Sequence, residues 1–169
     1  MELLRGKIKF IKLTDDKLIK EMMNKIFWSG LFLAVMAGCA SPKYSGSIME
    51  GGGSAEIVII NDKETRAGFQ EAMENWLKSN NYNYVVTPDN SEHVKDKINL
   101  EYIGLWSWDF AIFLADAHIT AFHNGQKVGH VEYKASNNLN FSKWGSGEKR
   151  IWNMMDILFG KKTPDEANK

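Results

Sequence analysis

Only a few side chains in this sequence are of types that support covalent, metal or acid–base chemistry. The 169-residue chain has one cysteine, Cys39, and four histidines, of which His118, His123 and His130 lie close together. A single cysteine excludes an intramolecular disulfide and any multi-cysteine metal site. The thiol is therefore buried, reactive or modified, and the residues around it decide between these options.

Cys39 follows an apolar segment that is typical of a secretory signal. Residues 26–37 carry no charge, and Lys25 precedes them. A membrane-spanning helix needs about 20 apolar residues, so this shorter run fits the h-region of a signal peptide better than a permanent span. We expect the segment to be removed during export.

The residues at the end of this segment, Met36, Ala37, Gly38 and Cys39, resemble the lipobox of bacterial lipoproteins. The resemblance implies that Met36, Ala37 and Gly38 are recognised by the signal peptidase and that Cys39 carries a diacylglyceryl group. The protein would then be attached to a membrane through this lipid. Such lipoproteins stay at the inner membrane when aspartate follows the cysteine. Because Ala40 stands there, the resemblance implies the periplasmic face of the outer membrane.

This interpretation divides the chain into five segments. Residues 1–21 are either a long n-region or the product of a misassigned start codon, and residues 22–38 form the signal peptide. Residues 39–55 comprise the lipidated cysteine and a flexible tether rich in small and turn-forming residues. Residues 56–160 form one periplasmic domain, and 161–169 a polar tail. The tether would span about 20 to 24 Å, so the domain would sit just clear of the headgroups.

The charge balance bears on the partner. The whole chain has 21 basic and 21 acidic residues, and the 131 residues from Cys39 onward have a net charge of −3. Neither value favours a nucleic-acid partner. The mature domain also has no electrostatic means of holding a membrane, so the lipid would have to do so.

The histidines do not converge in the strand register that the sequence predicts. Asn124-Gly125 predicts a two-residue hairpin turn in which Ile119 faces His130. His118 then lies on one face, while His123 and His130 lie on the other, roughly 13 Å apart along the strands. We therefore predict no metal site.

The same register predicts one possible acid–base set. Asp116, His118 and Tyr133 would share a face, but no nucleophile lies in a recognisable catalytic motif. We predict no catalytic residue, no cofactor and no enzymatic activity.

Four aromatic residues are candidates for a partner-binding surface. Trp106, Trp108, Phe141 and Trp144 adjoin predicted bends and loops, where aromatic side chains serve as anchors. The alternative is that they fill the core between sheet and helices.

Apolar periodicity predicts the elements that must position these residues. The helical spacing of Phe69, Ala72, Met73, Trp76 and Leu77 indicates a helix that packs on a sheet, with Asp62 as its cap. Predicted strands cover 56–60, 82–87, 98–105, 110–123 and 126–135, and the first two form a β-α-β unit with the helix at 63–79. A second predicted helix covers 148–159, with an apolar stripe of Ile151, Met154, Met155 and Leu158.

This order, β-α-β-β-β-β-α, predicts an α+β fold. We expect a two-layer α/β sandwich with a mixed, mainly antiparallel sheet and helices on one face. By organisation the chain resembles small accessory lipoproteins that dock on envelope machines. That resemblance implies a non-catalytic binding or adaptor module with an envelope protein or peptidoglycan as partner. A small-ligand or glycan binder and an envelope hydrolase are the alternatives.

Overall fold

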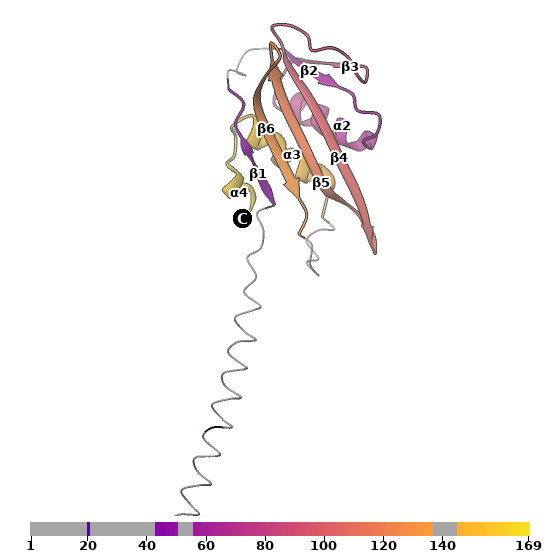
Figure 1. Ribbon diagram of the computed structural model, residues 1–169, viewed down its shortest axis with the longest axis vertical. Coiled ribbons are helices and arrows are strands. Elements are labelled where there is room, and N and C mark those ends of the chain that lie inside the picture. Colours follow the sequence, from indigo (N-terminus) through magenta and orange to yellow (C-terminus); the bar gives the residue numbers. More distant parts are fainter. Residues whose placement is uncertain (1–19, 21–42, 51–55, 137–144) are drawn as a thin grey trace, which may run out of the picture. The chain divides into compact units, whose positions relative to one another are not determined.

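The computed structural model describes residues 20, 43–50, 56–136 and 145–169. Residues from Ser41 to Lys169 belong to one compact unit. The described residues of this unit form an α+β fold with a six-stranded mixed sheet and three helices (Figure 1). Among the described residues, no helix combines the length and apolar character needed to cross a membrane.

The sheet has the strand order β1-β6-β5-β4-β2-β3. The pairs β1–β6, β6–β5 and β5–β4 are antiparallel, whereas β4–β2 and β2–β3 are parallel. The elements are β1 (Tyr44–Ser47), β2 (Ile57–Ile60), α2 (Ala67–Ser79), β3 (Tyr84–Thr87), β4 (Ile98–Asp109), β5 (Ala111–His123), β6 (Gln126–Lys134), α3 (Gly147–Leu158) and α4 (Pro164–Ala167).

The helical stripes predicted from the sequence form the core. All five predicted apolar residues of α2 are buried, and so are the four predicted for α3, namely Ile151, Met154, Met155 and Leu158. The β-α-β unit is confirmed, because β2 and β3 pair in parallel on either side of α2 in the sequence. These apolar contacts remove the helix faces from water. Burial of apolar surface is the main favourable contribution to the free energy of folding.

The two faces of the sheet differ in burial. Along β4, Leu100 and Tyr102 are buried, and Tyr102 stacks on Phe69 of α2 with ring centroids 5.1 Å apart. We call this side the core face. Glu101 and Ile103 alternate with these residues and are exposed. We call their side the open face.

The predicted tether is wrong for residues 44–47. These residues form β1, which pairs with β6 from Tyr44 opposite Tyr133 to Ser47 opposite His130. Tyr44 is buried and its ring lies 5.0 Å from that of Tyr133. A strand therefore forms in a Ser/Gly-rich segment because the edge of β6 supplies hydrogen-bond partners and Tyr44 supplies an apolar contact.

The predicted polar tail also contains structure. Residues 164–167 form α4, and Thr163 caps it through a reciprocal capping box with Glu166. Asn168 then accepts hydrogen bonds from the backbone amides of Lys43 and Tyr44, each at 2.9 Å. The end of the described chain thus holds the start of β1.

Candidate functional site

A groove lies where β2 ends and its neighbour β4 continues. The last pair between these strands joins Ile59 to Leu100, yet β4 runs on to Asp109. Beyond this point the loop after β2 borders β4, and the backbone amide of Gly104 donates a hydrogen bond of 2.9 Å to Thr65 Oγ1. The step between the two strand ends therefore becomes a cavity on the open face.

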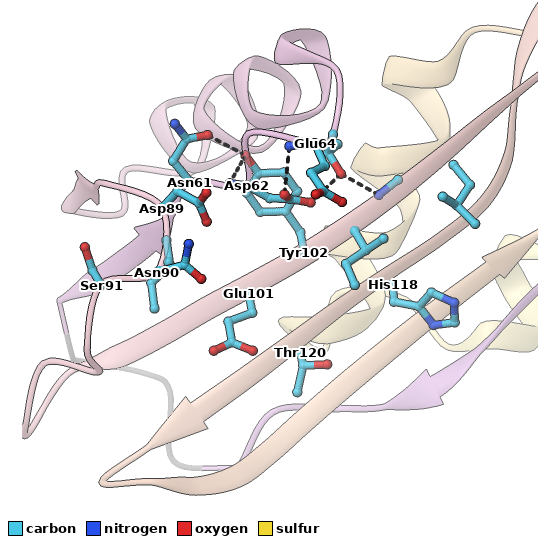
Figure 2. A pocket seen from close by; sticks show the side chains of 15 residues that line it. Asn61, Asp62, Glu64, Asp89, Asn90, Ser91, Glu101, Tyr102, His118 and Thr120 are labelled. Carbon is cyan, nitrogen blue, oxygen red and sulfur yellow. Dashed lines mark hydrogen bonds between the residues drawn. The ribbon is translucent and has the colours of Figure 1, made fainter.

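This groove has a volume of about 420 Å³. The loops after β2 and β3 form its sides, and β4 and β5 form its floor (Figure 2). Its lining residues are Ile60, Asn61, Asp62, Glu64, Thr65, Asp89, Asn90, Ser91, Glu101, Tyr102, Ile103, Gly104, Leu105, His118 and Thr120.

Asp62 shapes the loop that forms one side of the groove. Its carboxylate accepts hydrogen bonds from the Glu64 amide at 3.0 Å and from Thr65 Oγ1 at 2.7 Å. The predicted helix cap at Asp62 is therefore wrong, and α2 begins only at Ala67. An aspartate that bonds to a backbone amide two residues later stabilises a turn in place of a helix start.

Tyr102 joins this loop to β4 and α2. Its Oη accepts from the Asp62 amide at 3.2 Å and lies 3.3 Å from Asn61 Oδ1 and 3.2 Å from Gln70 Oε1. Burial raises the pKa of the Tyr102 phenol, so the hydroxyl stays protonated at neutral pH and remains a donor. We therefore assign Tyr102 a positioning role for the loop.

The floor of the groove combines aliphatic and charged side chains. Ile103 and Leu105 are 54% and 57% exposed, which is unusual for neighbouring aliphatic residues on one sheet face. Glu101 lies beside them and pairs with His93 at 2.9 Å. His118 rises from β5 and pairs with Asp116 at 2.8 Å.

Carboxylates dominate the charge of the groove. Asp62, Glu64, Asp89 and Glu101 all line it, and Lys63 lies 4.0 Å from Asp89. Acidic groups around an apolar floor favour a ligand that presents a cation next to an apolar segment.

The predicted acid–base set is only partly assembled. Asp116 and His118 do pair, but Tyr133 lies on the core face, where it is 2% exposed. Ala117 faces Tyr133, and Asp116 faces Lys134, because an irregularity between Ala121 and Phe122 shifts the register by one residue. A bulge adds one residue to a strand and so moves every later side chain to the other face.

This shift also changes the predicted histidine geometry. His123 faces Gln126 as predicted, but His130 faces Thr120 in place of Ile119. His118 and His130 therefore share the open face, contrary to the prediction. Within the described ranges, no three His, Cys, Asp or Glu side chains group as ligands of one metal ion.

The structure describes two of the four predicted partner-binding aromatics, Trp106 and Trp108. Trp106 is half-buried, and Arg66 lies 5.1 Å above its ring. Trp108 is 71% exposed. Phe141 and Trp144 lie outside the described residues, as do Met36, Ala37, Gly38 and Cys39.

Sequence reasoning missed the groove, although one signal was present. In the segment Glu101-Tyr102-Ile103-Gly104-Leu105, apolar Ile103 and Leu105 share the strand phase of the polar Glu101. Apolar residues in the solvent-facing phase of a strand indicate a surface that something covers.

Comparisons with known proteins assign no family. No family model matches this chain, and no curated protein matches it either. The case for its function therefore depends on its own residues and geometry.

Proposed function

We propose that this protein is a lipid-anchored, non-catalytic binding or adaptor module of the bacterial cell envelope. In this proposal Cys39 carries the lipid, and the domain lies on the periplasmic face of the outer membrane. The lipobox-like residues 36–39 after an uncharged segment support the anchor. The groove supports the binding role.

One observation carries the binding role, namely two exposed aliphatic side chains set among carboxylates in a concave site. Ile103 and Leu105 offer apolar area, while Glu101 offers charge at the same place. A segment of an envelope protein with a Lys or Arg beside an apolar residue satisfies both features. The peptides of peptidoglycan also carry amino groups, which would offer a positive charge in the same way.

We also propose the two-layer sandwich with helices on one face as the architecture behind this site. The alternation of buried and exposed residues along β4 and β5 supports it. A sheet that carries helices on one side only leaves the other side free to bind.

Crosslinking in intact cells tests the binding role. A photoreactive residue replaces Ile103, and Glu101→Lys is compared with Glu71→Lys, a matched change on the exposed surface of α2. We expect a discrete adduct that Glu101→Lys abolishes and Glu71→Lys leaves intact, because only the first change reverses charge in the groove. An adduct that is indifferent to both changes would overturn this assignment.

A small-ligand or glycan binder is the second candidate. The volume of about 420 Å³ falls within the usual range for small-molecule sites. The amides of Asn61 and Asn90 add hydrogen-bonding groups beside the carboxylates. An Ile103 adduct that muramidase degrades would favour this candidate, whereas one that only protease degrades would favour the adaptor.

A further inference from the structure

The hairpin of β4 and β5 ends in an exposed apolar tip. Trp108, Phe110 and Ile112 are 71%, 85% and 57% exposed, and we call these three residues the hairpin tip. The rings of Trp108 and Phe110 lie 6.4 Å apart. Such a cluster at the end of a long hairpin needs a covering surface, since isolated exposed apolar residues are common but aromatic clusters are not.

Phe110 lies at the apex of the hairpin and is the most exposed of the three residues. Phe110 has a φ of 58°, a left-handed conformation that bulky residues rarely adopt. Non-glycine residues in this conformation cluster at functional sites, so the outward placement of the Phe110 ring is a feature to be explained.

The chain enters the domain from the same end of the sheet as this tip. Tyr44, Tyr133, Ala117 and Gly104 form one row across four strands. The next contact towards the tip is the hydrogen bond from the Lys134 amide to the carbonyl of Lys43, at 2.8 Å. Figure 1 shows the start of β1 and the end of β4 at one end of the sheet.

Chain length sets how far the lipid-bearing residue can be from this row. Cys39 precedes Tyr44 by five residues, and Asp109 follows Gly104 by five residues. Five extended residues cover at most about 18 Å, and five residues of β4 cover about 17 Å. A membrane that holds Cys39 therefore lies within reach of the hairpin tip.

We propose that the hairpin tip inserts into the headgroup region of the membrane that holds the lipid anchor. Trp is enriched at this interface, and Phe also occurs on protein surfaces that bury into the boundary between headgroups and acyl chains. The inference rests on the proposed lipidation of Cys39. A bilayer is favoured over a second copy or a protein partner because the short connection brings lipid to this end of the domain. The tip and the anchor together would hold the groove at a defined height above the headgroups.

Site-specific fluorescence on the mature lipidated protein tests this inference. Lipidation consumes the only native thiol, so Phe110→Cys introduces a single site for an environment-sensitive probe. Gln126→Cys, an exposed site at the opposite end of the sheet, is the matched control. Both proteins are reconstituted in vesicles of phosphatidylethanolamine with a minority of phosphatidylglycerol.

Nitroxide lipids labelled near the headgroup should quench the Phe110→Cys probe, while aqueous iodide should not. The Gln126→Cys probe should show the reverse. A second probe at Ile112→Cys leaves Trp108 and Phe110 intact, in case labelling of the apex itself prevents insertion.

Each other outcome has a distinct meaning. A lipidated, vesicle-bound protein whose two tip probes are both quenched by iodide overturns the inference and leaves the proposed anchor standing. Protection from both quenchers means that protein covers the tip, which also overturns it. Mass spectrometry that finds Cys39 unmodified overturns the proposed anchor and this inference together.

Discussion

Gly104 lies beneath the groove at a point with no room for a side chain. A Cβ placed there would lie 2.6 Å from Phe69 Cδ2 and 3.2 Å from Thr65 Cγ2. Phe69 is fully buried, so it cannot move without disturbing the core. At the residue scale, this close approach keeps the loop after β2 against β4.

Gly104→Ala should therefore lower the free energy of unfolding by about 1 to 3 kcal/mol, because overpacking displaces buried side chains. Urea unfolding of the chain from residue 40 onward measures the change. Gly68→Ala is the control, since its Cβ would meet nothing within 4 Å on α2. That change should stabilise by about 0.5 to 1 kcal/mol. Equal effects of the two substitutions would contradict the packing argument.

Glu74 should contribute a pH-dependent part of the stability. Burial opposes ionisation of its carboxyl, but hydrogen bonds from Gln70 and Tyr84, together with Lys78, lower its pKa below the ordinary value of 4.5. A carboxyl whose pKa is lower in the folded than in the unfolded state stabilises the fold above its ordinary pKa. This contribution is lost as the pH falls through the folded pKa.

Tyr84→Phe should thus destabilise the protein by about 1 kcal/mol at pH 7 and by less in acid, because it removes the 2.8 Å hydrogen bond to Glu74. Urea unfolding at pH 7 and at an acidic pH measures the free energy of unfolding of both proteins. Tyr82→Phe removes a hydroxyl that does not contribute to the Glu74 pKa and serves as the control. A Tyr84→Phe effect of the same size at both pH values would argue against the assignment.

At the scale of elements, α4 clamps the start of β1. Asn168 Oδ1 accepts from the Lys43 and Tyr44 amides, and Asn168 Nδ2 donates to the Tyr44 carbonyl at 3.0 Å. This clamp shortens the connection between the anchor and the domain, because residues 44–47 would otherwise be free to extend it.

Asn168→Ala should accelerate hydrogen exchange of the β1 amides, since all three side-chain bonds disappear. Asn168→Asp keeps both acceptor bonds and should give an intermediate rate. Exchange in β4 should stay unchanged in both variants. If β1 exchanged at the same rate in both variants and in the original protein, α4 would not be a clamp.

Element types were predictable because they depend on local periodicity. The apolar spacings of α2 and α3 and the Asn124-Gly125 turn were all interpreted correctly from neighbouring residues. The bulge near Phe122 and the pairing of β1 with β6 were not, because they depend on a partner strand elsewhere in the chain.

At the scale of the whole molecule, the proposed lipid anchor would determine which membrane holds the protein. Cys39→Ser should abolish lipid labelling and release the protein from membranes, because no acyl chain then remains to hold it. Metabolic labelling with palmitate and membrane fractionation measure both effects.

Ala40→Asp is the matched control for this change. It should retain the lipid and move the protein from the outer to the inner membrane, as the resemblance to bacterial lipoproteins implies. Membrane association that persists in Cys39→Ser, with no lipid detected, would mean that another part of the chain holds the bilayer.

The sequence alone determined the α+β class, the helical faces that form the core, and the expectation of a lipid at Cys39. Each of these depends on residues that are close together in the chain. The groove and the position of the hairpin tip were decided only by the tertiary structure. Both depend on where β2 ends relative to β4 and on which end of the sheet β1 enters. Those relations join residues that are far apart in sequence. The exposed phase of Ile103 and Leu105 indicates a covered surface, but it does not show where β2 ends beside β4.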